Sequence, residues 1–313
     1  MNAIAQSDTS RTTWQAGVAA DTALRELVGH SIKLPSVPGL YDQVITEVES
    51  PRGSMDLVAR LVARDPAISA RILQIVNSAA FAPAQPITSP HDAVLFLGAE
   101  CIKAVILFGE ILAPLKNTIC RGFSLSDLWR HSVSVGTMAL QIARMEKASA
   151  EIREASFTAG LLHDVGKILF VGNMPVRYGV VVERARVQNI TLKDAEEQVF
   201  GTNHADLGAL LLTSWGLPQT LIDTVGWHHE PCLSGDRAFS LLSAVHIANA
   251  LDHELHDAPL ASAALNLDYL DAIGVQHRCE HWRAAFDINQ PTPPLKRAGN
   301  SLSPVSNCLA TVA

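Results

Sequence analysis

The stretch DLVARLVARDPAISARILQIV, residues 56–76, decides the fold class of this chain. Its large apolar residues recur at intervals of three and four positions, which is the spacing of one face of an α-helix, and not at the intervals of two typical of a strand. Asp65-Pro66, in its middle, places a capping residue before a proline, as helix starts often do. We therefore expect short helices in close succession here.

The same spacing continues outward along nearly the whole chain. Ser89-Pro90 is another helix start of the same kind. The one run rich in β-branched residues, 178–182, is followed by charged residues that continue a helical pattern, so we interpret it as a buried helix face. Strand signals are otherwise nearly absent. The sequence therefore predicts an all-α protein.

Composition suggests where the helical region begins, divides and ends. Residues 1–24 are polar and rich in small residues, and residues 286–313 are rich in proline and serine, so we expect both to be flexible. Between them, LAPLKNTICRGF at 112–123 interrupts two apolar helical stretches. We expect a domain over 25–285 with two helical lobes, 25–115 and 116–285.

Charge and composition exclude several classes of function. The formal net charge is −7 without a basic run, so no nucleic-acid partner is expected. No apolar run approaches the length of a membrane span, and the first residues lack the pattern of a signal peptide. The five cysteines show no paired spacing typical of a disulfide framework or a zinc knuckle. We expect a cytoplasmic protein that neither spans nor binds a membrane.

Histidine is the unusual residue of this composition, with 12 copies, and several lie beside acidic residues in the second lobe. Imidazole and carboxylate groups that converge from different helices can bind a divalent metal ion. Lys167, about one helical turn after His163, could contact an anionic group such as a phosphate. The candidate ligands are Asp127, His131, His163, Asp164, His204, His228 and His229.

Most of these residues also fit a purely structural role. Asp127 follows Ser124 by three positions, as in a capping box, and His131 could be a hydrogen-bonded core residue. A surface position suits His204, and the pair 228–229 could favour the dipole of a helix end. His163 and Asp164 are different, because they interrupt an apolar run where a carboxylate without a partner is costly to bury. We expect the remaining histidines, including His246 and His253, to be packing or surface residues.

The order of motifs along the chain resembles the HDOD domain. The segments that carry the resemblance are LPSVP, DPAISARILQIVNSAAF, ITSPHDAVLFLGAECIKAVIL, LWRHSV, AGLLHDVGKILF, HADLGALLLTSWGLP and HHEP. Together they cover roughly residues 25–285. HDOD domains are all-helical relatives of the HD and HD-GYP metal phosphohydrolases, occur in bacterial signal-transduction proteins, and are usually regarded as regulatory. The resemblance implies an HDOD-type fold whose second lobe is HD-like.

The resemblance also implies roles for individual residues. The metal ligands would be His131, His163, Asp164, His204, His228 and His229, with Asp164 bridging two ions. Asp127 would match an additional carboxylate of some relatives, and Lys167 would face substrate phosphate. The metal could be iron, manganese, zinc or magnesium.

Two departures weaken the enzymatic reading. Asn249 stands near the place of a late aspartate ligand, and a neutral amide is a poorer ligand for a hard cation. After His228-His229-Glu230 the chain lacks the GYP signature of cyclic dinucleotide hydrolases.

Two hypotheses follow for the function. In the first, which we favour, the chain is a non-catalytic regulatory module of bacterial signal transduction that binds signalling proteins, and its histidine cluster is a structural or sensing site. In the second, it is a metal-dependent phosphohydrolase in which Lys167 neutralises the charge of the substrate phosphate. Asn249 favours the first hypothesis, and the metal content of the purified protein would help to separate the two.

Overall fold

The computed structural model describes residues 14, 22–78, 81–256 and 264–288, and over these ranges it is helical without any strand. The all-α prediction is confirmed. One isolated bridge joins Cys120 and Phe123. The α-helices are α2 (Thr22–His30), α3 (Gly39–Glu49), α4 (Met55–Val62), α5 (Pro66–Val76), α6 (Pro90–Leu112), α7 (Leu125–Met145), α8 (Ala150–Leu162), α9 (Val165–Asn173), α10 (Pro175–Gln188), α11 (Leu192–Phe200), α12 (His204–Ser214), α13 (Gln219–Trp227), α14 (Leu241–Leu255), α15 (Leu267–Ala272) and α16 (Cys279–Ala285).

The helices begin where the sequence places capping residues. Asp65 accepts hydrogen bonds from the backbone N–H groups of Ala67 and Ile68, and Ser89 accepts one from that of Asp92. These side chains satisfy amide groups that have no partner within the first turn of a helix. The helix starts expected at Asp65-Pro66 and Ser89-Pro90 are therefore confirmed.

Helix α10 corrects one detail of the sequence analysis. Residues 178–182 are helical as expected, but they do not form one buried face: Tyr178 and Val181 are buried, whereas Val180 is 55% exposed. Consecutive residues of an α-helix are about 100° apart, so five in a row pass all the way round the axis. The outward side of α10 therefore carries valine.

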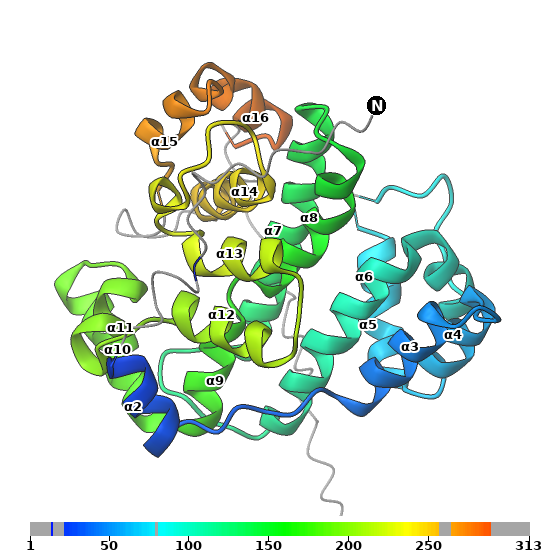
Figure 1. Ribbon diagram of the computed structural model, residues 1–313, viewed down its shortest axis with the longest axis horizontal. Coiled ribbons are helices and arrows are strands. Elements are labelled where there is room, and N and C mark those ends of the chain that lie inside the picture. The colour runs from blue at the N-terminus through cyan, green and yellow to red at the C-terminus, as the bar shows by residue number, and fades with distance from the viewer. Residues whose placement is uncertain (1–13, 15–21, 79–80, 257–263, 289–313) are drawn as a thin grey trace, which may run out of the picture.

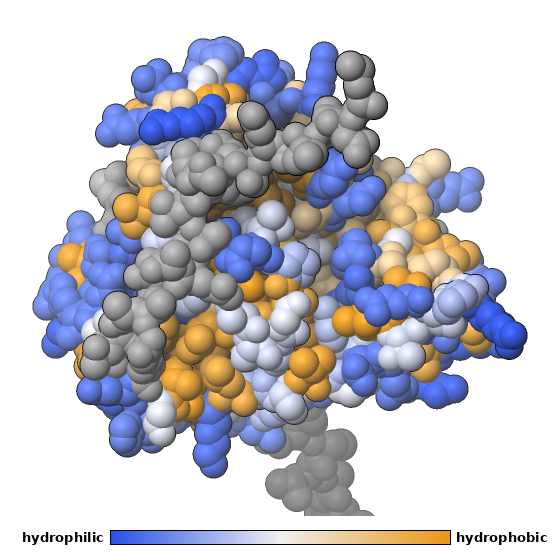
Figure 2. All heavy atoms as spheres, viewed as in Figure 1, coloured by the Kyte–Doolittle hydropathy of each residue, from blue (hydrophilic) through white to orange (hydrophobic). Residues whose placement is uncertain are grey.

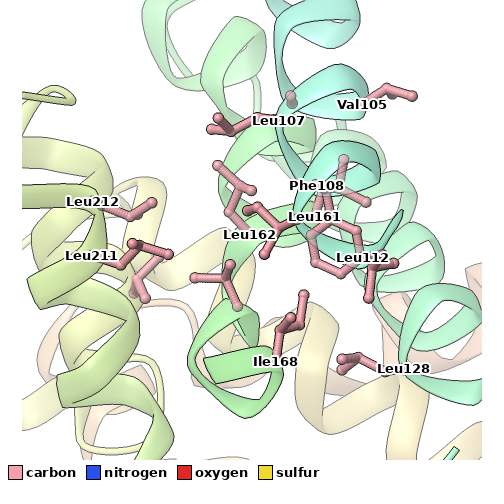
Figure 3. Close-up of a cluster of buried hydrophobic side chains, with 14 of the residues drawn as sticks. Val105, Leu107, Phe108, Leu112, Leu128, Leu161, Leu162, Ile168, Leu211 and Leu212 are labelled. Atoms are coloured by element: carbon pink, nitrogen blue, oxygen red, sulfur yellow. The ribbon is translucent and has the colours of Figure 1, made fainter. Parts of the chain in front are cut away.

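The main hydrophobic core crosses the expected boundary between the two lobes. Figure 3 shows Phe108 and Leu112 of α6 beside Leu161 of α8, with Ile168 of α9 close by. These residues belong to one continuous cluster whose members range along the chain from Trp14 to Leu242. The two lobes therefore share one core.

The segment after α2 is attached to the second lobe. The backbone N–H of Lys33 donates to the side chain of Asn173 at the end of α9, and the indole of Trp215 donates to the carbonyl of Pro35. Figure 1 accordingly places α2 near α9 to α11, away from α3 to α5. The residues expected to open the first lobe thus contact the second.

A smaller hydrophobic cluster joins α7 and α8 to the C-terminal helices α14, α15 and α16, which lie together at the top of Figure 1. Figure 2 shows mainly hydrophilic residues over the C-terminal helices and over the side of α10 and α11 that faces the viewer. None of the described helices is long and apolar enough to cross a membrane.

The two segments expected to be flexible fall mostly outside the described residues. Within 1–24, Trp14 is buried: its backbone N–H donates to Asp223 and its indole to Asp206. Within 286–313, residues 286–288 are described and the remainder of that segment is not. The expectation of flexible ends therefore stays a prediction. Within the first of them, Trp14 is held in place by its hydrogen bonds to Asp223 and Asp206.

Candidate metal centre

Asp164 lies at the centre of the histidine cluster because it stands at the junction between two helices. Helix α8 ends at Leu162. His163 is its C-cap residue, and Asp164 is the N-cap residue of α9. Both side chains are almost fully buried, with exposed fractions of 0% for His163 and 1% for Asp164. The interruption lets two adjacent residues of an apolar segment point to the same buried place.

The surrounding groups divide into two sets that share Asp164. One set is Asp164, His204, His228 and His229, and the other is His131, His163 and Asp164, with the ligand atoms of each set within 4.8 Å of one another. The first set faces one carboxylate oxygen: Nε2 of His204 is 3.2 Å and Nε2 of His228 3.8 Å from Oδ1. The second faces the other oxygen, Oδ2, at 3.6 Å from His131 and 3.4 Å from His163.

Four of the histidines are held by hydrogen bonds from their Nδ1 atoms, so that Nε2 points to the centre. The acceptors are the carbonyls of Gly160 and Val225 for His163 and His228, both at 2.7 Å, and the carboxylates of Asp252 and Glu196 for His131 and His204, both at 2.6 Å. With the proton on Nδ1, each Nε2 presents a lone pair. This tautomer is the one that a metal-binding histidine requires.

Several central atoms are buried and lack hydrogen-bond partners within the described part of the chain. They are Nε2 of His131, His163 and His228, Oδ1 of Asp164 and Oδ1 of Asn249. Buried polar atoms are normally paired, so a concentration of unpaired acceptors in one place indicates that a cation belongs there.

The spacing of the first set fits one metal ion. Nε2 of His204 lies 2.9 Å from Nε2 of His229, in addition to 3.2 Å from Asp164. A neutral His204 would turn its lone pair towards both neighbours, which is unfavourable unless a proton or a metal cation lies between them. Ligands about 2.0–2.1 Å from a tetrahedral zinc ion are about 3.3 Å apart, close to the observed separations.

Burial and neighbouring charge shift the pKa values of the clustered groups in different directions. Burial lowers the pKa of His163, and lowers those of His228 and His229 well below the ordinary value, so these rings are neutral near pH 7. Burial opposes ionisation of Asp164, but electrostatic interactions with His163 and Lys167, together with hydrogen bonds from His163 and His204, hold its pKa well below the ordinary value. For His204, burial alone would lower the pKa, but the charge of Glu196 and hydrogen bonds to Glu196 and Asp164 together raise it.

Glu196 is a functional candidate that the sequence analysis missed. It is fully buried and accepts hydrogen bonds from Nδ1 and the backbone N–H of His204, and from the hydroxyl of Tyr178 at 2.7 Å. A carboxylate that accepts the second ring proton orients a metal-binding histidine and increases its basicity. No motif in the sequence links Glu196 to His204, eight residues later, so this contact follows only from the fold.

The helix α14 supplies further polar groups near the cluster, of which Asp252 was not among the sequence candidates. Asp252 bonds to His131 and also accepts from Ser134, and the ring of His253 lies 4.9 Å from that of His131. Asn249 is buried on the same helix. His246, expected to be a packing or surface residue, is buried and bonds through Nδ1 to the carbonyl of His228 at 2.9 Å. Asp252 is therefore the carboxylate from this later part of the chain that contacts His131.

Lys167 lies inside the cluster. Its Nζ is 2.5 Å from Oδ2 of Asp164, and its side chain is 11% exposed. The ammonium group thus contacts the oxygen that faces His131 and His163. A metal ion bound to this second set would have to share that oxygen with a buried positive charge.

Asp127 is the candidate that the structure does not bring to the cluster. Its side chain is 61% exposed and pairs with Arg130 at 3.1 Å. It occupies the first turn of α7, where its backbone N–H donates to the capping hydroxyl of Ser124. Of the two roles considered for Asp127, the geometry matches the helix start and corrects its inclusion among the ligands.

Comparison with known proteins places this arrangement in a family. A solved HDOD domain protein of unknown function from Geobacter sulfurreducens is 26% identical, with a TM-score of 0.67 over 85% of this chain and 93% of that one. A protein from Shewanella amazonensis that is provisionally named a phosphohydrolase is 21% identical, with a TM-score of 0.62 over 86% and 94% of the two chains. A Marinobacter aquaeolei protein, provisionally named a signal transduction protein, is 19% identical, with a TM-score of 0.62 over 88% and 64%.

A curated relative from Treponema pallidum, which is uncharacterised, is 25% identical over 216 residues. These cover 69% of this chain but 41% of the relative, so the chain spans about two fifths of that protein's length. The model of the HDOD domain family matches residues 34–231, which include all the candidate ligands. The chain belongs to the HDOD domain family.

Proposed function

We propose that this protein is a regulatory module of bacterial signal transduction that binds one divalent metal ion through Asp164, His204, His228 and His229. The observation that carries the proposal is the convergence of these four ligand atoms. Among them, Oδ1 of Asp164 and Nε2 of His228 lack a hydrogen-bond partner within the described residues, and outer hydrogen bonds from Nδ1 orient His204 and His228. Three nitrogens and one oxygen favour zinc, iron or manganese over magnesium, which prefers oxygen ligands.

Charge balance supports one ion in preference to two. With neutral imidazoles, the cluster contains the carboxylates of Asp164, Glu196 and Asp252 and the ammonium group of Lys167. These groups leave two negative charges, which one divalent cation neutralises. A second cation would leave an excess of positive charge in a buried site, which is costly. The neutral Asn249 adds no charge to compensate for it.

The regulatory role is supported by the burial of the ligands and by the family. A catalytic metal site keeps one coordination position open to substrate, whereas structural sites are closed. Here Asp164, His204 and His228 are at most 1% exposed, and His229 is partly buried. HDOD domains and a neighbour named for signal transduction provide the context for a module that responds to a ligand or partner.

A metal-dependent phosphohydrolase is the second candidate, because Lys167 is positioned to meet a phosphate beside the cluster. When bound, the metal would supply a Lewis acid that polarises the phosphoryl group. Lys167 would bind the phosphate oxygens, provided that its ammonium group leaves Asp164.

Elemental analysis and an activity assay together test the two candidates. We expect protein purified without chelator to contain about one transition-metal ion per chain and to show no hydrolysis of bis(p-nitrophenyl) phosphate with added manganese or iron. Hydrolysis that is lost in Lys167→Ala while the metal is retained would establish the second candidate. Protein without bound metal, before and after incubation with these ions, would contradict both.

A further inference from the structure

The outward face of α10 carries an unusual concentration of exposed apolar side chains. Of the ten large hydrophobic residues that are exposed in the described part, three lie on α10: Val176 at 83%, Val180 at 55% and Val187 at 66%. A fourth, Ile119 at 89%, lies in the segment before α7. They line one groove of about 580 Å³, together with Arg121 and Glu183 among others. Apolar groups gathered in this way commonly mark an interaction surface.

The valines form a regular stripe along the helix. Val176, Val180, Glu183 and Val187 follow one another at intervals of four, three and four residues, which is the spacing of a seam between two helices. Tyr178 and Val181 point to the opposite side, into the core. One side of α10 thus packs within the molecule, and the other has the pattern of a helix that packs against a second helix.

Of the charged side chains beside the stripe, some are already engaged within the molecule and others could contact a partner. Arg177 lies over the ring of Phe200 at 4.9 Å, and Arg184 donates to Gln198 at 3.4 Å, so both are engaged with α11. On the other side of the stripe, Arg121 packs against Gly179 and forms no ion pair within the described residues. Glu183 is exposed and bonds only to Arg186 of its own helix. A carboxylate and a guanidinium group therefore flank the same edge of the groove.

We propose that this face pairs with the same face of a second copy of the chain, with the two α10 helices antiparallel about a two-fold axis near their middle. Such an axis brings Val176 opposite Val187 of the second copy. It also brings Glu183 of the second copy level with Val180, beside Arg121. Both contacts occur twice, so the surface is complementary to itself in shape and charge, as a two-fold interface must be.

The size of the surface sets the expected strength of the pairing. A stable interface buries about 800 Å² on each partner. The proposed surface is limited to one face of one helix and an adjacent loop, so we expect a small interface. We therefore expect a dimer that dissociates reversibly at micromolar concentrations. This interface does not depend on the proposed metal site.

Sedimentation velocity of the full chain, measured across micromolar concentrations, tests the proposal. We expect the wild type to show a reversible monomer–dimer equilibrium, and Val180→Asp and Val187→Asp each to weaken it at least tenfold. Leu57→Asp changes an exposed apolar residue elsewhere and serves as the matched control, with dimerisation unchanged. Circular dichroism checks that each variant remains folded, as expected for substitutions at exposed positions.

Charge reversal tests the orientation. Glu183→Arg and Arg121→Glu should each weaken the dimer, and the double variant should restore it, because the pair is re-formed with opposite signs. A chain that is monomeric at every concentration overturns the proposal. So does a dimer that persists in both valine variants, which would place the interface on another surface.

Discussion

A single carboxylate, that of Asp164, connects every part of the candidate site. Its Oδ1 faces His204 and His228, its Oδ2 faces His131 and His163, and Lys167 bonds to it directly. In an otherwise apolar segment such a group is retained only if these partners stabilise its charge. The account therefore depends on this residue more than on any other.

Replacing Asp164 by Asn should abolish metal binding and leave the fold intact. The amide can still accept a hydrogen bond from Lys167, but it loses the negative charge that a cation needs. We expect metal content at background level by elemental analysis, and a loss of about 1–3 kcal/mol in the free energy of unfolding of the metal-free protein.

Asp127→Asn is the matched control for this experiment, since it makes the same chemical change at an exposed carboxylate. Its metal content should equal that of the wild type. An Asp164→Asn variant that retains stoichiometric metal, or an Asp127→Asn variant that loses it, would show that the ligands are assigned wrongly.

Glu196→Gln should weaken metal binding without removing a ligand. Glutamine keeps an acceptor for Nδ1 of His204 but lacks the charge that makes the ring more basic. Competition with a chromogenic chelator should show a 10- to 100-fold lower affinity, which is the usual effect of such outer partners. Asp194→Asn, an exposed change on the same helix, should leave the affinity unchanged; equal effects of both variants would point to a general loss of stability.

The sequence could identify most of this cluster but not its supports. His163 and Asp164 stand out because they interrupt an apolar run, and the geometry brings them together with His131, His204, His228 and His229. Asp127 was misjudged because it lies four residues before His131, although the first turn of α7 is at the surface. Asp252, 121 residues from His131, could not be paired with it before the fold was known.

At the scale of helices, the centre requires α9 and α12 to approach very closely. A methyl group on Gly166 would lie 1.9 Å from the carbonyl oxygen of His204 and 2.8 Å from the amide nitrogen of Gly208. Only glycine fits this contact. The backbone that carries Lys167 is thereby held against the helix that begins with His204.

Gly166→Ala should therefore force α9 and α12 apart. We expect the free energy of unfolding to fall by about 1–3 kcal/mol, as for other overpacked cores, and metal affinity to decrease as His204 moves from Asp164. Chemical denaturation and metal titration measure the two effects. Gly172→Ala, on the same helix but facing the flexible side chain of Leu115, should be tolerated; similar losses in both variants would argue against the importance of the close approach.

Helix positions were more predictable than helix faces. Capping residues such as Asp65 and Ser89 act within a few residues, so the sequence reveals them directly. The orientation of α10 depends on what surrounds it, and its run of valines contains both core and surface positions. Composition alone could not show which valine faces outward.

The main hydrophobic core of the molecule contains residues from both sides of the lobe boundary that the sequence predicted near residue 115. The proline and polar residues after α6 do interrupt a helix, which explains the choice of that position. However, α6 also packs on α8 and α9, as Figure 3 shows. Contacts between distant segments of this kind leave no local signal in the sequence.

A fragment of residues 25–115 should therefore not fold independently. Separated from α8 and α9, it would expose Leu107, Phe108 and Leu112, which are buried in the intact chain. We expect thermal unfolding, followed by circular dichroism, to show a single cooperative transition for the full chain and none for the fragment. A cooperative transition in the isolated fragment would show that the lobe is a domain in its own right.

The most direct test of the central claim is anomalous diffraction from crystals of the protein loaded with zinc or manganese. The account predicts one strong peak among Nε2 of His204, His228 and His229 and Oδ1 of Asp164, at ligand distances of about 2.0–2.2 Å. A crystal with no peak in this cluster, or with its only peak at surface residues, would contradict it.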